Sequence, residues 1–204
     1  CALPICSTST RAIDSIVAAG SSLNLSSTTV TSVEVIKAGL TSTTVFTLAQ
    51  RDLVSGVAVI GSASLTDTLV AAGTSLNLSS ATLSNIAVVA AGSASATTFV
   101  VGATTLAQNI QVNGNGSSVI DALVVSATKA DLSSATLSGI EIIKTDTDKG
   151  LQLTVSQNDL VAGGSVIGGK GTDALVAATN ALDLSSTSLS SIELVKGRDT
   201  NGTA

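Results

Sequence analysis

One unit of sequence occurs four times along this chain, and that regularity limits the folds the chain can adopt. A Leu-Ser-Ser core marks each copy, at Leu25, Leu78, Leu132 and Leu184, so successive copies are 53, 54 and 52 residues apart. A fixed period of about 20 to 50 residues is typical of architectures in which each repeat stacks on the next. The chain is therefore a repeat protein.

The copies occupy all of the chain except its first residues. They run over about 11–64, 65–116, 117–171 and 172–204, the last one cut short, which makes about 3.7 copies of one solenoid domain. Residues 1–10 do not fit the repeat and contain both cysteines, Cys1 and Cys6. These two either close a small disulfide loop, which would indicate an oxidising compartment, or stay free thiols. An N-terminal cysteine also occurs in lipid-modified bacterial proteins.

The composition favours a thin, elongated molecule. The 204 residues include no His, Trp, Tyr or Met and only two Phe. Globular cores take much of their buried area from aromatic side chains. This core must instead come from many small and branched aliphatic residues, each worth about 1.5–3 kcal/mol when fully buried. An interior that is narrow everywhere suits such residues.

Short β-branched runs separated by Gly, Ser, Thr and Asn indicate strands throughout the chain. In the second copy they are 69–71, 76–78, 86–89, 99–101 and 110–112. No run has the length or period of a helix. Because every copy repeats the same residue types at the same offsets, we expect an all-β, parallel β-solenoid, with two or three coils in each repeat. The number of residues per coil stays open.

Charge and hydropathy exclude two classes of partner. Only 11% of the residues are charged, the formal net charge is -5, and there is no basic run. With almost no aromatic surface for base stacking, we expect no nucleic acid partner. No apolar stretch reaches the length of a membrane span, so we also expect no membrane-spanning segment.

Residues at matching repeat positions are expected to stack directly above one another. We call each such set of matching positions a column. In the Phe column, aromatic or aliphatic side chains are expected to lie inside the rod. In the Ser column, the hydroxyl groups are expected to hold tight corners by bonding to the backbone. The Asp column starts a strand in each copy. The members are Phe46, Phe99 and Leu153; Ser26, Ser79, Ser133 and Ser185; and Asp14, Asp67, Asp121 and Asp173.

A Glu and a Lys recur three residues apart in three copies, as Glu34/Lys37, Glu141/Lys144 and Glu193/Lys196. We expect these charges to pair across levels and to help set register, at about 0–1 kcal/mol for each exposed pair. Asn-x-Ser/Thr glycosylation patterns also occur, at Asn24, Asn77, Asn115 and Asn201. Asp131 and Asp183 replace the first two in later copies, which indicates a position for a small polar residue.

The segment Gly168-Gly169-Lys170-Gly171-Thr172-Asp173-Ala174-Leu175 resembles the glycine- and aspartate-rich nonapeptide of RTX (haemolysin-type) secreted bacterial proteins. The longer run from Val155 to Gly169, followed by Leu182 to Ser186, is similar to the degenerate long repeats of large RTX-like surface proteins. This resemblance implies an extracellular or cell-surface location on bacteria. It also implies calcium bound by Gly169, Gly171 and Asp173, although the other copies lack the glycine pattern and Ca²⁺ takes about six to eight oxygens.

Three functions follow from these patterns. We predict an extracellular structural protein whose copies stack end to end into a filament, matrix or surface layer, because open solenoid ends present unpaired backbone groups. The alternative is the repeat or stalk region of an RTX-like, calcium-binding adhesin. We expect no enzyme and no obligatory cofactor, because the charges sit in repeated columns and there is no histidine.

Overall fold

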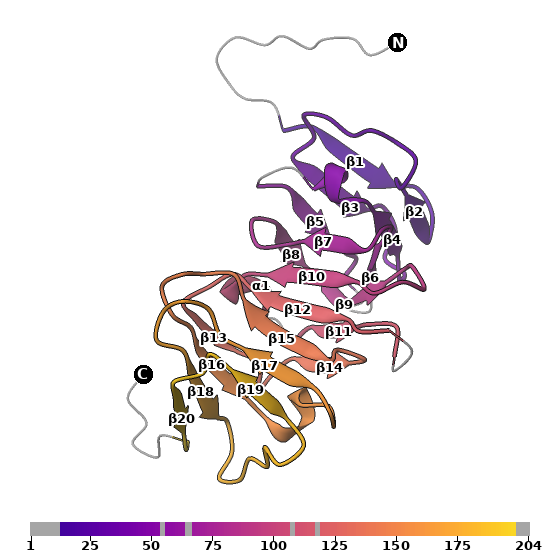
Figure 1. The fold of residues 1–204 in the computed structure, drawn as a ribbon. Coiled ribbons are helices and arrows are strands. Elements are labelled where there is room, and N and C mark those ends of the chain that lie inside the picture. The colour runs from indigo at the N-terminus through magenta and orange to yellow at the C-terminus, as the bar shows by residue number, and fades with distance from the viewer. Residues whose placement is uncertain (1–12, 54–55, 64–66, 107–108, 117–118, 199–204) are drawn as a thin grey trace.

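The chain forms a parallel β-solenoid of about eight coils, so the predicted all-β solenoid fold is confirmed. In the computed structural model, the described residues are 13–53, 56–63, 67–106, 109–116 and 119–198. Every strand pair is parallel, and residues facing each other on neighbouring coils are between 19 positions (Asp67 and Ile86) and 25 positions (Gln111 and Thr136) apart. Figure 1 shows the strands stacked along one axis from β1 to β20.

The coils have three sides, which we number in the order in which the chain visits them. Side 1 begins with a four-stranded sheet and ends with another. The short helix α1 contacts both β8 and β13, and so joins these two sheets. Its elements are β1 (Ser15–Ala18), β3 (Val35–Ala38), β5 (Ala58–Ile60), β8 (Thr82–Ser84), α1 (Ala103–Leu106), β13 (Lys129–Asp131), β16 (Gln152–Val155), β18 (Ala174–Ala177) and β20 (Leu194–Lys196).

Sides 2 and 3 each hold one six-stranded sheet and one 3-10 turn. Side 2 contains β2 (Ser22–Asn24), β4 (Val45–Leu48), β6 (Asp67–Ala71), β9 (Ile86–Ala91), β11 (Gln111–Asn113), β14 (Thr136–Ser138) and η2 (Gln157–Asp159). Side 3 contains η1 (Gln50–Asp52), β7 (Ser75–Asn77), β10 (Thr98–Val101), β12 (Ala122–Val125), β15 (Ile142–Thr145), β17 (Ser165–Ile167) and β19 (Ser188–Ser190).

One sequence repeat covers seven sides, not a whole number of coils. The second repeat runs through β6, β7, β8, β9, β10, α1 and β11 before the third repeat begins with β12. Seven sides of a three-sided coil are two coils and one further side. Each repeat therefore begins one side further round the rod than the repeat before it.

This rotation corrects the expectation that matching repeat positions stack directly. Phe46 lies on side 2, Phe99 on side 3 and Leu153 on side 1. Phe46 and Phe99 are fully buried, as an internal position requires, but each is stacked between leucines. Phe46 pairs with Leu23 and Leu69, and Phe99 pairs with Leu76 and Leu123.

The Asp and Ser columns are distributed round the rod in the same way. The strands that begin at or just after the four aspartates are β1, β6, β12 and β18, which occupy sides 1, 2, 3 and 1. The physical reason is that strand stacking requires only an aliphatic side chain facing inward. Different repeat positions meet that requirement equally well, so the columns of the interior mix them.

The corners that lead into β3, β9, β15 and β20 share a left-handed backbone conformation. The residues are Ser32, Asn85, Gly139 and Ser191, with φ between 51° and 60°. A non-glycine residue with positive φ is uncommon, and Asn is among those that tolerate it best. The repeat therefore specifies the direction of this turn in each copy.

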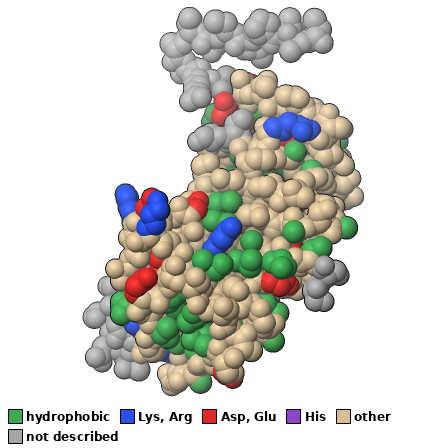
Figure 2. All heavy atoms as spheres, in the orientation of Figure 1, with side chains coloured by type: hydrophobic (Ala, Val, Ile, Leu, Met, Phe, Trp, Pro, Cys, Tyr) green, Lys and Arg blue, Asp and Glu red, His purple; other side chains and the backbone are tan. Residues whose placement is uncertain are grey.

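The outer surface carries few charges and some apolar side chains. Figure 2 shows hydrophobic side chains gathered over the region of β12 and β15. Ala122 and Val124 point outward there but stay buried between neighbouring coils. Within the described part of the chain, no helix has the length and hydropathy that crossing a membrane would take.

Candidate functional site

Three buried aspartates make the most strongly built polar sites in the described chain. Asp67, Asp121 and Asp173 are at most 1% exposed, whereas Asp14 at the first coil is exposed. A buried carboxylate is tolerated only where hydrogen bonds replace its hydration. Each of these carboxylates must therefore be held by donors within the rod.

Each buried aspartate links two coils through backbone N–H groups. The Asp121 carboxylate accepts from Thr97 N at 2.5 Å, on the coil beneath, and from Asn115 N at 2.6 Å, on its own coil. Asp173 accepts in the same way from Leu151 N and Gly169 N, at 2.6 and 2.7 Å. We call this arrangement the aspartate clamp.

The clamp in the second repeat adds a side-chain donor. The Asp67 carboxylate accepts from the backbone N–H of Thr44, and Ser62 donates both its backbone N–H, at 2.6 Å, and its hydroxyl, at 2.7 Å. Charge-assisted hydrogen bonds of this kind are among the stronger ones in proteins. The recurring aspartate thus sets the spacing between coils at one corner of the second, third and fourth repeats.

Glycine is required next to the clamp because the backbone passes very close to the carboxylate. A Cβ added to Gly168 would lie 1.8 Å from the carbonyl oxygen of Ser191 and 2.6 Å from Asp173 Oδ2. Any side chain would therefore push the coils apart. This explains the glycine in the segment that resembles an RTX nonapeptide without invoking a ligand.

The recurring glutamates add a hydrogen bond to the same corner from the next coil along the chain. Glu141 Oε2 accepts from the backbone N–H of Asp121 at 2.8 Å, and Glu193 does the same for Asp173 at 2.7 Å. In the second repeat Ala87 takes the place of the glutamate, and the pairing of β6 with β9 shifts register beside Asp67. The glutamate therefore caps a backbone donor and fixes register.

The expected pairing of Glu with Lys across levels is wrong. The Glu34 carboxylate accepts from Asp14 N at 2.9 Å, so these glutamates are directed to backbone groups. Among the described residues, the one ion pair joins Lys170 to Asp148 at 3.2 Å, and both side chains are well exposed. Such a pair contributes about 0–1 kcal/mol.

The calcium site implied by the RTX resemblance does not fit the geometry. Asp173 accepts a backbone N–H at each of its two oxygens, and Gly169 presents a donor to it where the RTX arrangement needs an acceptor. Gly171 packs against the backbone of Lys149 and Gly150. Across the described ranges, no group of three or more His, Cys, Asp or Glu side chains could hold an ion.

The serine corners use the residue two positions earlier as the acceptor. Asn24 Oδ1 accepts from Ser26 N, and Asp183 Oδ1 accepts from Ser185 N, at 2.9 and 2.8 Å. The same turn occurs with Asn77 and Ser79 and with Asp131 and Ser133. The hydrogen bonds from Ser185 lower the pKa of the exposed Asp183 carboxyl. These are Asx turns, so the small polar side chain is the acceptor that organises the corner, and at Ser79 the hydroxyl also donates to that acceptor, at 2.7 Å.

A second buried carboxyl, which the sequence analysis did not single out, lies on each 3-10 turn. Asp159 in η2 accepts from the backbone N–H and the hydroxyl of Ser156, at 2.6 and 2.8 Å, through Oδ2. Its Oδ1 is buried without a hydrogen-bond partner, as is Oδ1 of Asp52 in η1. Burial raises the pKa of the Asp159 carboxyl, and the negative charge of Asp131 adds to the rise, although the bonds from Ser156 oppose it. The Ser-x-x-Asp spacing was a usable signal for this turn.

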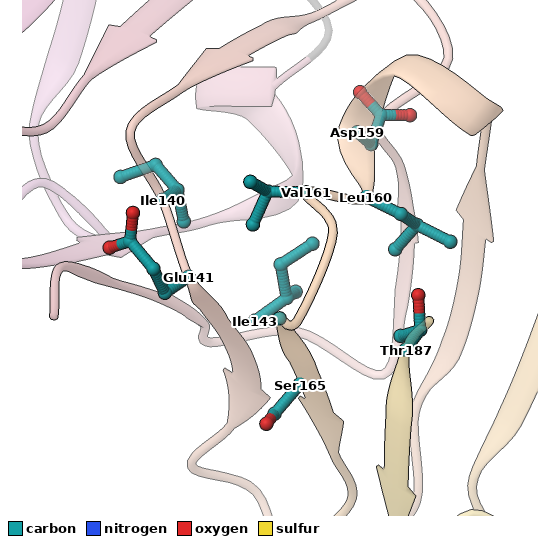
Figure 3. A pocket seen from close by; sticks show the side chains of 9 residues that line it. Ile140, Glu141, Ile143, Asp159, Leu160, Val161, Ser165 and Thr187 are labelled. Atoms are coloured by element: carbon teal, nitrogen blue, oxygen red, sulfur yellow. The ribbon is translucent and has the colours of Figure 1, made fainter. Parts of the chain in front are cut away.

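The interior cavity beside this carboxyl is too small for a ligand. It has a volume of about 10 Å³ and lies between β15, β17 and the residues after η2. Figure 3 shows the side chains of Ile143, Leu160 and Val161 around it, while the Asp159 carboxyl points away from Ile143. That volume holds about one water molecule at most.

A larger depression lies on the outside of side 1, at the end of the rod that carries β20, which is the lower end in Figure 1. Its volume is about 340 Å³, and its lining includes Lys149, Gln152, Leu194 and Lys196. It is open to solvent and adjoins β20, the outermost described strand of its sheet. This surface and the neighbouring strand edge together form an open area for contact at this end of the described rod. The predicted disulfide pair Cys1 and Cys6 lies outside the described residues.

Comparison with known proteins adds no relative: no protein-family model, curated protein or solved structure matches this chain.

Proposed function

We propose that this chain is a structural protein: a rigid β-solenoid rod whose copies join end to end into a filament, matrix or surface layer. The observation that carries the proposal is the exposure of an inward-facing residue in β20, at one end of the rod. Val195 occupies the strand position that is filled by Ile36, Val89 and Ile143 in the earlier repeats. Those three are at most 2% exposed, whereas Val195 is 55% exposed.

A further coil placed on β20 would cover this position. Leu194 in the same strand is 43% exposed, and β20 ends its sheet, with one strand edge unpaired among the described elements. An exposed, apolar strand edge is a template for pairing with another chain. A second copy of the rod presents a matching strand, β1, at its opposite end.

The end of the rod that carries β1, the upper end in Figure 1, has the complementary properties. β1 is the outermost described strand of its sheet there, and its inward-facing Ile16, which pairs with the fully buried Ile36 on the next coil, is only partly buried. Asp14 is exposed at this end, while Lys149 and Lys196 border the depression at the other. Contact between unlike ends does not close on itself, so it yields a fibre.

The location of such a fibre follows only from the RTX resemblance in the sequence. That resemblance favours secretion and assembly on the surface of a bacterial cell. The solenoid itself is compatible with many locations, because a fold does not define a function.

Electron microscopy and light scattering of the purified chain test the proposal. We expect filaments whose mass grows with protein concentration, and we expect Val195→Lys to leave monomers by placing a charge in the joint. Val161→Lys is the matched control, because Val161 is 41% exposed on the flank of the rod. Assembly that Val195→Lys leaves intact, or a wild-type chain that stays monomeric with folded ends, would rule the proposal out.

The second candidate is a stalk within a longer RTX-like adhesin. The seven-side length of the repeat favours this candidate as well. Each further repeat would add seven sides and extend the same rod without interrupting the stacking of its coils. This candidate predicts monomers and a melting temperature that rises with calcium. The filament proposal predicts assembly that a calcium chelator does not change.

A further inference from the structure

We propose that Asn115 is a site of spontaneous deamidation, and that its conversion to a carboxylate opens the aspartate clamp of the third repeat. The segment Asn113-Gly114-Asn115-Gly116 contains two Asn-Gly pairs. In such a pair the glycine backbone nitrogen attacks the Asn side-chain carbonyl carbon and ammonia leaves. Water then opens the cyclic imide to aspartate or isoaspartate. Glycine favours this reaction because no side chain shields its nitrogen.

The structure separates the two pairs. Gly114 N donates to Ser138 O at 2.8 Å, and a Cβ added to Gly114 would lie 1.9 Å from the carbonyl oxygen of Gly139. The nitrogen that would attack Asn113 is therefore held in the coil-to-coil hydrogen bonding. While the rod is folded, Asn113 is protected.

Gly116 is in a different situation. It has φ of 76°, its Cα faces open space, and its N–H makes no hydrogen bond within the described part of the chain. The backbone nitrogen that follows Asn115 is thus not committed to the coil ladder. The reaction at Asn115 can proceed without unfolding the strands on either side.

The Asn115 amide also contributes hydrogen bonds to the clamp. Its Nδ2 donates to Ser95 O at 2.9 Å, to Asp121 Oδ1 at 3.3 Å and to Thr97 Oγ1 at 3.4 Å. A carboxylate at this point has no proton to donate. It would face a carbonyl oxygen and the buried Asp121 carboxylate, and like charges so close repel each other.

The isoaspartate product disturbs the clamp a second time. Asn115 N donates to Asp121 Oδ2 at 2.6 Å, and the isoaspartate linkage adds a methylene to the backbone immediately after that donor. Both products weaken the joint between the second and third repeats, near the middle of the rod. An aged chain would therefore open at this corner first.

Peptide mapping by mass spectrometry of chain aged at neutral and mildly alkaline pH tests the assignment. We expect aspartate and isoaspartate to accumulate at position 115 while Asn113 stays unchanged in folded protein, and both to convert in denaturant. Gly116→Ala should slow the reaction several-fold. Conversion at Asn113 first, or no conversion at Asn115 in the folded chain, would overturn the proposal.

The consequence for stability has its own matched variants. Ser62 fills the corresponding place in the clamp of the second repeat, so Asn115→Ser should keep the wild-type melting temperature. Asn115→Asp should lower it, and the aged, deamidated fraction of wild-type chain should melt lower as well. The aged fraction provides the measurement if Asn115→Asp does not fold. An unchanged melting temperature in the deamidated fraction would contradict the role of the amide in the clamp.

Discussion

Phe46 and Phe99 occupy the same place in consecutive repeats, yet they lie on different sides of the rod, each between two leucines of its own sheet. The rotation by one side per repeat produces this arrangement. Bulky aromatic residues are thereby spread round the interior instead of being stacked in one column. Each side of the narrow core can then accommodate its own large residue between smaller neighbours.

This arrangement makes a prediction for the core position that holds Phe in two repeats and Leu153 in the third. Phe99→Ala should cost about 3–5 kcal/mol of unfolding free energy, because it leaves a cavity between Leu76 and Leu123. Phe99→Leu should cost less, since Leu serves at the matching position. Chemical denaturation measures both, and equal losses would show that the site does not depend on side-chain volume.

The aspartate clamp predicts a large difference between residues of one sequence column. Asp121→Ala leaves the buried backbone N–H of Thr97 without an acceptor, at about 1–3 kcal/mol, and removes the acceptor of the part-buried N–H of Asn115 as well. The same change at exposed Asp14 should lower the midpoint of denaturation far less. If Asp14→Ala and Asp121→Ala are equally destabilising, the carboxylate does not act through these two bonds.

Asp159 should make stability depend on pH. Its pKa is raised above the ordinary 3.8, so the folded state prefers the protonated form. The stability that comes from this preference is full below the unfolded pKa and is lost as pH rises through the folded pKa. Asp159→Asn should therefore gain stability relative to wild type between acidic and neutral pH.

Denaturation curves at a series of pH values measure this difference. Asp148→Asn changes the net charge equally at an exposed site and serves as the control. A difference between Asp159→Asn and wild type that stays constant with pH would show that the buried carboxyl does not titrate in this range.

The sequence was sufficient to predict a parallel solenoid, because period and residue type alone indicate stacking. It was not sufficient to predict which residues stack. Leu23, Phe46 and Leu69 come from three repeat positions but serve one inward column, since each supplies only an apolar side chain of suitable size. Nothing in the 53-residue period reveals that it contains seven sides.

For the predicted site residues, too, the sequence was sufficient to identify them but not to predict their contacts. The aspartates were found because they recur, and their burial could not be inferred because Asp14 and Asp121 look alike in sequence. The clamp depends on backbone donors such as Thr97 N, which leave no mark on residue identity. The glutamates were found with their lysines, but the partner of each glutamate is again a backbone N–H.

Cysteine cross-linking tests most directly whether one repeat covers seven sides of the three-sided coil. The experiment uses a background in which Cys1 and Cys6 are replaced by serine. Thr98 faces Ser75 on the neighbouring coil, at the strand spacing of about 4.8 Å, which lies within the Cα separation that a disulfide spans. Val45 holds the same repeat position as Thr98 but lies on another side. We predict that the pair Ser75→Cys and Thr98→Cys forms a disulfide under mild oxidation and that the pair Val45→Cys and Thr98→Cys does not. The reverse result would mean that like positions stack directly, and it would contradict the account.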